Sequence, residues 1–174
     1  MIRICAWCGK NMGAAPSDVH AETIITHGVC AACLNKLFGE EGVELQVFLD
    51  SLAVPVVVVD ATVTVKTANR PARALLHKEA PDIEGYKGGD VFECAHAKQP
   101  EGCGYTIHCS GCVIRQTVTD TFRSGRSHLK VPACLQNGTP ADHEQVNLLI
   151  STEKVGGVVL LRMDEVGGTL GAPP

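Results

Sequence analysis

Residues 48–76 read FLDSLAVPVVVVDATVTVKTANRPARALL, and the periodicity in and just before this stretch decides how the chain folds. Apolar residues at the start of this stretch, and just before it, follow the i, i+3, i+4, i+7 spacing of one helix face. They are Leu45, Phe48, Leu49 and Leu52. The pattern predicts a helix that ends near Pro55. Residues 56–59 are four valines, a β-branched run that predicts a short buried strand.

The rest of the stretch predicts a hairpin followed by a short helix. Val63 and Val65 alternate with polar residues, which indicates a second strand that meets the valine strand near Asp60. Asn69 is a favourable helix N-cap. Pro71 falls in the first turn of that helix, where the missing N–H of proline removes no hydrogen bond.

Further along the chain, the sequence predicts an irregular segment, a helix and three strands. Residues 78–111 are interrupted by repeated glycines and prolines, which favours loop structure. A helix is expected from the spacing of Ile114, Val118 and Phe122, with Gly125 placed to end it in a left-handed cap. Apolar runs then predict strands at 129–135, 146–150 and 158–161, joined by turns at Asn137-Gly138 and Gly156-Gly157.

The composition is that of a globular protein, with 45% hydrophobic and 20% charged residues in a chain of 174. A formal net charge of -4 and only 4% aromatic residues disfavour nucleic acid as a partner, because phosphates attract basic surfaces and bases stack on aromatic rings. The N-terminal residues lack the apolar stretch of a signal peptide, and the longest apolar run, 52–59, is far shorter than a membrane span. We therefore expect a cytoplasmic protein with no membrane partner, whose closely spaced cysteines bind metal rather than form disulfides.

Eight of the cysteines form two groups of four. The first group follows a CxxC…CxxC pattern with 21 residues between its pairs, and consists of Cys5, Cys8, Cys30 and Cys33. Two such pairs can hold one ion in a tetrahedron, so we expect structural zinc that stabilises a segment too small to fold alone. Small buried cysteines or a thioredoxin-type redox motif are the alternatives. His27 could replace or orient a ligand, although a role outside the ligand set suits it better, since four thiols already complete the site.

The order of elements resembles the PAS sensory fold over residues 43–164, mainly in the quoted stretch and the three closing strands. The resemblance implies an α+β fold: a PAS-like five-stranded antiparallel sheet with helices on one face, here preceded by the small zinc-binding module. It also implies that the segment before the helix at Ile114 borders a pocket for ligands or cofactors. The expected domains are a four-cysteine zinc-binding module at 1–39, a PAS-like sensor domain at 40–165 with a cysteine-rich insertion at 90–112, and a flexible tail at 166–174.

The second group of cysteines lies in this segment, with gaps of eight, five and two residues between Cys94, Cys103, Cys109 and Cys112. Neighbouring glycines let the backbone approach a metal closely. Four thiolates at such spacing accept zinc or a [4Fe–4S] cluster. Some PAS sensors with four cysteines carry iron–sulfur clusters, but the spacing here differs from their paired pattern and slightly favours zinc. His96 and His108 are close enough in sequence to be alternative ligands, although exposed loop positions suit them better.

The ninth cysteine, Cys134, stands apart from both groups. The alternation of its strand places it on the face opposite Ala133 and Leu135, where it could be a partly exposed thiol. An inert, packed cysteine is the favoured interpretation.

These features favour a signal-transduction sensor or adaptor that detects a small molecule or a redox state through metal–cysteine sites. No catalytic constellation is visible, so we expect no enzyme activity and a signal that passes to a separate output protein or through a homodimer. The opening helix at 43–52 is the candidate contact surface. Two alternatives remain: a structural zinc protein acting as an interaction adaptor, and a thiol–disulfide oxidoreductase, which needs an exposed, low-pKa cysteine that stays free once metal is bound.

Overall fold

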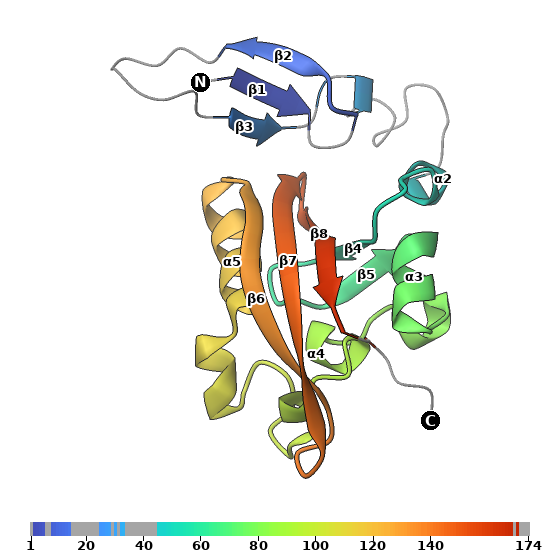
Figure 1. Ribbon diagram of the computed structural model, residues 1–174, viewed down its shortest axis with the longest axis vertical. Helices are drawn as coiled ribbons and strands as arrows, with labels where there is room; N and C mark the ends of the chain where they lie inside the picture. The colour runs from blue at the N-terminus through green and yellow to red at the C-terminus, as the bar shows by residue number, and fades with distance from the viewer. Residues whose placement is uncertain are drawn as a thin grey trace. The chain divides into compact units, whose positions relative to one another are not determined.

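The computed structural model describes residues 2–5, 8–14, 25–28, 30, 32–33, 45–168 and 170 (Figure 1). The chain divides into two compact units, Met1–Ser51 and Leu52–Pro174. The predicted domain boundary at 39/40 lies outside the described residues. None of the described helices combines the length and the apolar character needed to cross a membrane.

The first unit contains a small three-stranded sheet in the order β2-β1-β3. The described elements of this unit are β1 (Ile2–Cys5), β2 (Asn11–Ala14), β3 (Ile25–Gly28) and helix α2 (Leu45–Asp50). β1 runs antiparallel to β2 and parallel to β3. Two backbone hydrogen bonds link the end of β1 to the residues before β2: the Gly9 N–H, at a φ of 70°, donates to the Cys5 carbonyl at 2.9 Å, and the Cys5 N–H donates to the Lys10 carbonyl at 2.8 Å. Cys8 lies next to Gly9 in this part of the chain.

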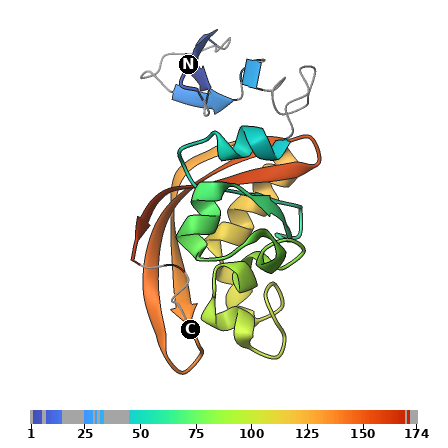
Figure 2. The same cartoon turned by 90° about the vertical axis from the view of Figure 1, so that its right-hand side faces the viewer.

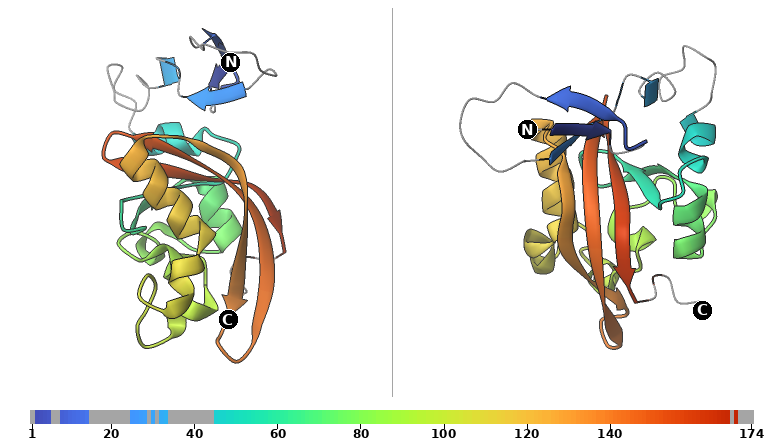
Figure 3. Two further views of the ribbon diagram at one scale, coloured as in Figure 1. Left: turned by 90° about the vertical axis from the view of Figure 1, so that its left-hand side faces the viewer. Right: turned by 45° about the horizontal axis from the view of Figure 1, so that its top comes forward.

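The second unit is a five-stranded antiparallel sheet in the order β5-β4-β8-β7-β6. Its strands are β4 (Val56–Val59), β5 (Val65–Ala68), β6 (His128–Gly138), β7 (His143–Val155) and β8 (Val158–Gly167). Helices α3 (Arg70–Leu76), α4 (Gly88–Val91) and α5 (Val113–Ser124) lie over one face of this sheet, as Figures 2 and 3 show. The sheet and its one-sided helical layer confirm the predicted PAS-like α+β fold.

The core lies between the sheet and this helical layer. β4, β7 and β8 contribute alternate side chains, and α3 and α5 contribute their inner faces; the buried residues include Val57, Val59, Leu148, Ile150, Leu161, Ala72, Leu76 and Val118. The α5 helix packs against β6, β7 and β8 and ends at Gly125, which takes a left-handed φ of 73° as predicted. Leu170 is also buried in this core, and Val166 belongs to β8, so these residues of the predicted tail are packed.

Asn69 fixes the position of α3 against the sheet and is fully buried. Its Oδ1 accepts hydrogen bonds from the N–H of Ala72 at 3.0 Å, which is the predicted N-cap, and from the N–H of Val56 at 2.8 Å. Its Nδ2 donates to the Val54 carbonyl at 2.8 Å. One side chain therefore caps α3 and holds the start of β4.

The β4–β5 hairpin forms as predicted, but its turn is longer than the sequence indicated. Val63 lies in this turn at a φ of 58°, and β5 begins only at Val65. The Asp60 carboxylate explains the difference, because it accepts the N–H of Thr62 at 2.9 Å and that of Thr64 at 3.0 Å. These bonds hold the chain in a wide turn and take Val63 out of the strand.

Two further predictions about local structure are wrong. Asn137-Gly138 is not a turn: both residues belong to β6 and pair with Glu144 and His143, and the turn lies between Thr139 and Asp142. Residues 78–111 are also more regular than predicted. They contain α4 and the 3₁₀ helices η1 (Ala80–Asp82), η2 (Ala95–Lys98) and η3 (Ile107–Gly111).

Candidate metal centres

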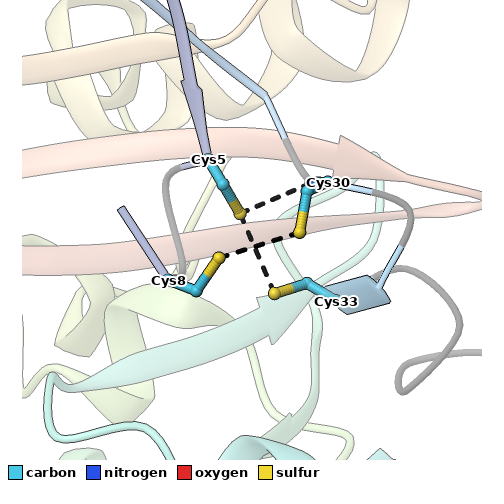
Figure 4. A group of neighbouring side chains, drawn as sticks. All are labelled: Cys5, Cys8, Cys30 and Cys33. Carbon is cyan, nitrogen blue, oxygen red and sulfur yellow. Dashed lines mark hydrogen bonds between the residues drawn. The ribbon is translucent and has the colours of Figure 1, made fainter. Parts of the chain in front are cut away.

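The first group of cysteines converges on one point, as Figure 4 shows. All four sulfurs lie within 4.8 Å of one another; the Sγ atoms of Cys5 and Cys33 are 3.8 Å apart and those of Cys8 and Cys30 are 3.7 Å apart. A tetrahedral zinc ion with Zn–S bonds of 2.3 Å places its sulfurs about 3.8 Å apart. The observed spacing therefore fits a single zinc ion.

The surroundings of these sulfurs also suit a bound cation. Cys5, Cys30 and Cys33 are buried and Cys8 is exposed. The Cys30 N–H donates to the Cys5 sulfur at 3.3 Å. A hydrogen bond from the Cys33 backbone N–H lowers the pKa of Cys30 to about 7, whereas burial raises the pKa of Cys33. Because burial disfavours thiolate charge, a cation among the sulfurs is what would keep all four deprotonated. His27 lies in β3, where its backbone pairs with Ile4 of β1. The side chain of His27 is not among those that the structure describes.

The second group of cysteines lines a single cavity of about 260 Å³ in the second unit. Cys94 precedes η2, Cys103 lies in a turn, Cys109 lies in η3 and Cys112 is the N-cap of α5. His96 and His108 line the same cavity. The two imidazole rings stack on each other, with centroids 3.9 Å apart and 14° between their planes. Four separate local structures thus bring the four predicted cysteines to one space.

The spacing of these sulfurs differs from that in the first group. Among the described residues, the first group is the one set of three or more Cys, His, Asp or Glu ligand atoms that all lie within 4.8 Å of one another. No three sulfurs of the second group therefore meet as closely as the ligands of a single zinc ion do. A cluster of several iron atoms takes its thiolates farther apart, and the cavity leaves room between them.

Backbone amides point at two of these sulfurs. The Gly89 N–H donates to Cys103 Sγ at 3.3 Å, and the Gly104 N–H donates to Cys109 Sγ at 3.1 Å. The Thr106 hydroxyl is also 3.2 Å from Cys109 Sγ. Hydrogen bonds of this kind stabilise thiolates and tune the electronic properties of a bound metal.

The four thiols of the second group are not equivalent. Burial raises the pKa of Cys103 and of Cys112. Burial also acts to raise the pKa of Cys109, but hydrogen bonds from Thr106 and Gly104, with the nearby charge of Arg115, lower it overall. Cys109 is therefore more readily deprotonated than Cys103 or Cys112.

The cavity is attached to the sheet through Cys94. Cys94 forms an antiparallel bridge with Asn137 of β6, and the Gly138 N–H donates to the Glu93 carbonyl at 3.0 Å. The Glu93 carboxylate makes ion pairs with Lys78 and Lys98. The first cysteine of the group is thus held by both the edge strand and a small charge network, neither of which local sequence patterns indicate.

Cys134, which the sequence placed outside both groups, also lines the cavity of the second group. It lies on β6 with an exposed side chain, while its neighbours Ala133 and Leu135 are buried. The predicted alternation is confirmed, and the preference for a packed thiol is wrong.

Comparisons with known proteins give neighbours in structure alone. No protein-family model matches the sequence, and no curated protein matches it. The chain is similar to the PAS domain of the quorum-sensing receptor RpfR from Cronobacter turicensis in complex with BDSF, with 17% identity, 63% of this chain and 90% of that chain covered, and a TM-score of 0.44.

Two further solved structures are similar. The photoactive yellow protein domain of the sensor histidine kinase Ppr from Rhodospirillum centenum has 14% identity, covers 76% of this chain and 99% of its own, and has a TM-score of 0.44. A domain of a sensory box sensor histidine kinase/response regulator from Geobacter sulfurreducens has 10% identity to this chain and a TM-score of 0.48. The match covers 73% of this chain and 100% of that domain. Because these TM-scores are below 0.5, the fold assignment rests on the strand order and the helical layer described above.

Proposed function

We propose that this chain is a sensory signal-transduction module in which the cysteine cavity of the PAS-like unit holds the sensing metal centre. One observation carries the proposal: Cys94, Cys103, Cys109 and Cys112, drawn from separate local structures, line one cavity between the sheet and its helical layer. The first group of cysteines has a different task in this proposal. Its zinc stabilises the small N-terminal sheet and takes no part in sensing.

An iron–sulfur cluster is the centre that the second site favours. Its sulfurs are spread more widely than those of the first site, and amides of Gly89 and Gly104 point at two of them. When bound, such a cluster supplies a one-electron couple and sensitivity to oxygen. The chain's own residues then hold the ligands: Gly89 orients Cys103, Gly104 and Thr106 orient Cys109, and the pairing with Asn137 orients Cys94.

The signal is proposed to leave through a protein partner, either a separate output protein or a second copy of the chain. Helix α2 is the proposed contact surface. Its Val47 is 59% exposed, whereas the adjacent Phe48 and Leu49 are buried. An exposed apolar side chain beside a buried face offers a contact point for another protein.

Metal analysis after anaerobic purification tests the proposal. We expect about one zinc per chain, together with about four iron and four acid-labile sulfide, and a brown visible spectrum that oxygen bleaches. Replacing the four cysteines of the second group with serine should remove the iron and leave the zinc. The reciprocal variant of the first group should remove the zinc.

Other results would favour the remaining hypotheses. Two zinc ions and no iron, with a colourless protein that ignores oxidants, would point to the structural adaptor. Near-absence of metal, with native thiols open to alkylation and able to reduce a disulfide substrate, would point to the oxidoreductase.

A further inference from the structure

An open groove of about 380 Å³ lies beside the cysteine cavity, along α5. Its lining residues are Cys109, Ser110, Arg115, Gln116, Thr119, Asp120 and Arg123. Two of these residues, Cys109 and Arg115, also line the cysteine cavity. They form the wall between the two spaces, so a ligand in the groove would lie next to a cysteine of the candidate centre.

The positive charges of this groove are not balanced locally. Arg115 and Arg123 are exposed residues eight positions apart, which puts them on one helix face and about 12 Å apart along the axis. Within the described part of the chain, neither guanidinium makes an ion pair with a carboxylate. Asp120, the carboxylate in the groove lining, is engaged by Arg126 at 3.2 Å and by His128 at 2.7 Å. Among the described residues, these two exposed guanidinium groups therefore have no carboxylate partner.

Hydrogen bonds hold the end of the groove near Cys109 in place. The Gln116 side-chain amide donates to the Ser110 carbonyl at 2.6 Å, and the Ser110 hydroxyl donates to the Ile107 carbonyl at 2.8 Å. Thr119 lies in the lining between the two arginines and supplies a hydroxyl group. The groove thus combines a fixed wall with cationic and neutral donors.

We propose that this groove binds a multivalent oxyanion, with Arg115 and Arg123 as its main contacts. Guanidinium groups bind phosphate and carboxylate oxygens through paired N–H donors, and a pair of them on one helix face can converge on one anion or hold its two ends. The binding site stands independently of the metal centre. A regulatory effect of anion binding rests on the function proposed above. An anion bound to the Arg115 guanidinium in the groove would change the electrostatic surroundings of Cys109.

Calorimetric titration of the full chain tests the site, with inorganic phosphate in one arm and succinate in the other, at constant ionic strength. Wild type is expected to bind at least one of the two, which assigns phosphate or carboxylate chemistry. Arg115→Ala and Arg123→Ala should each bind at least about tenfold more weakly, because each loses a charged pair of donors. Arg123→Lys keeps the positive charge but loses the planar, paired N–H donors of the guanidinium group. Its affinity for the anion should lie between those of the alanine variants and that of wild type.

Arg70→Ala is the control, since it removes an exposed arginine from α3, and it should bind as wild type does. Circular dichroism of each variant checks that α5 is still folded. No binding by wild type, or binding by both groove variants equal to wild type, overturns the proposal.

Metal content is measured in the same samples. Phosphate binding without iron in the cavity would therefore reject the proposed centre alone, and an iron-loaded chain without anion binding would reject the groove site alone.

Discussion

The Gly89 N–H donates to the Cys103 sulfur at 3.3 Å, and a Cβ atom on residue 89 would stand 2.7 Å from that sulfur. The same atom would lie 2.9 Å from Cys103 Cβ and 3.0 Å from Ala97 Cβ. The backbone of α4 can therefore approach the cysteine only because residue 89 has no side chain. This close approach makes Gly89 the most sensitive test of the geometry of the cavity.

Gly89→Ala is expected to displace Cys103 and to lower the metal content of the cavity, while the zinc of the first site stays in place. Overpacking of this kind costs about 1–3 kcal/mol of unfolding free energy. Metal analysis and urea unfolding measure the two effects. Gly157→Ala is the matched control, because a Cβ there meets nothing within 4 Å. Equal iron content in the two variants would contradict the geometry described for Cys103.

Asp60→Asn is expected to destabilise the second unit in a pH-dependent way. Burial of this carboxylate acts to raise its pKa, but hydrogen bonds from Lys66, Thr62 and Thr64 outweigh burial and lower the pKa well below its ordinary value. The carboxylate thus contributes stability that is fully present above its unfolded pKa of about 3.9 and is lost as the pH falls toward its lower folded pKa. We expect a loss of about 1–2 kcal/mol near pH 6 that shrinks steadily below about pH 4.

Urea unfolding of wild type and Asp60→Asn at the same pH values measures this difference in unfolding free energy. Any release of metal in acid affects both proteins equally and therefore cancels from the comparison. Asp82→Asn, at an exposed position in η1, is the control and should show no such trend. A difference that grows as the pH falls would have the wrong sign.

Asn69→Ala is expected to be among the most damaging substitutions away from the cysteines. It leaves the N–H groups of Ala72 and Val56 and the Val54 carbonyl without the partner they have now. Buried groups left unsatisfied in this way cost about 2–4 kcal/mol in total. Asn69→Asp keeps the acceptor, loses the donor and buries a charge, so it should also be destabilising. An unfolding free energy within about 0.5 kcal/mol of wild type for the alanine variant would refute this role.

Removal of zinc from the first site is expected to unfold the small sheet without unfolding the larger one. The β1–β2–β3 sheet is joined to buried cysteines, whereas the second unit has its own hydrophobic core. Hydrogen exchange before and after treatment with a chelator should show loss of protection at Ile2–Cys5 and retention at Val56–Val59. Cys134→Ser should retain its zinc and behave as wild type. Simultaneous loss of protection in both units would show that the zinc site stabilises the whole chain.

Periodicity predicted the body of this fold well. The valine run of β4, the Asn69 cap and the Gly125 helix end all depend on residues close together in sequence, so local preference was enough to identify them. The predicted Asn137-Gly138 turn failed because those two residues are held by partners far away in the chain. Asn137 bridges Cys94, and Gly138 donates to Glu93, and both contacts extend β6 past a sequence that favours a turn.

The candidate sites were predictable in part for the same reason. The CxxC…CxxC spacing indicated the first site directly, because each pair already forms a ligand turn. The second set of cysteines could be grouped by number but not by geometry, since its shape depends on contacts between segments. Gly89 was missed because the cysteine it contacts, Cys103, lies 14 residues away in the sequence. Arg115 is close in sequence to Cys109, but no sequence pattern indicates that its charge acts on that thiol. The sequence offered one signal for Gly89: the pair Gly88-Gly89 comes shortly before the cysteine-rich segment, where the backbone could approach a cysteine closely.

The bridge between Cys94 and Asn137 also covers part of an exposed sheet edge. β6 is an edge strand, and an exposed edge offers unpaired N–H and C=O groups to any strand of another molecule. The segment at Glu93 and Cys94 occupies part of that edge near its end. If the proposed metal centre helps to hold this segment in place, loss of the metal is expected to expose those groups and to favour association through the edge of the sheet.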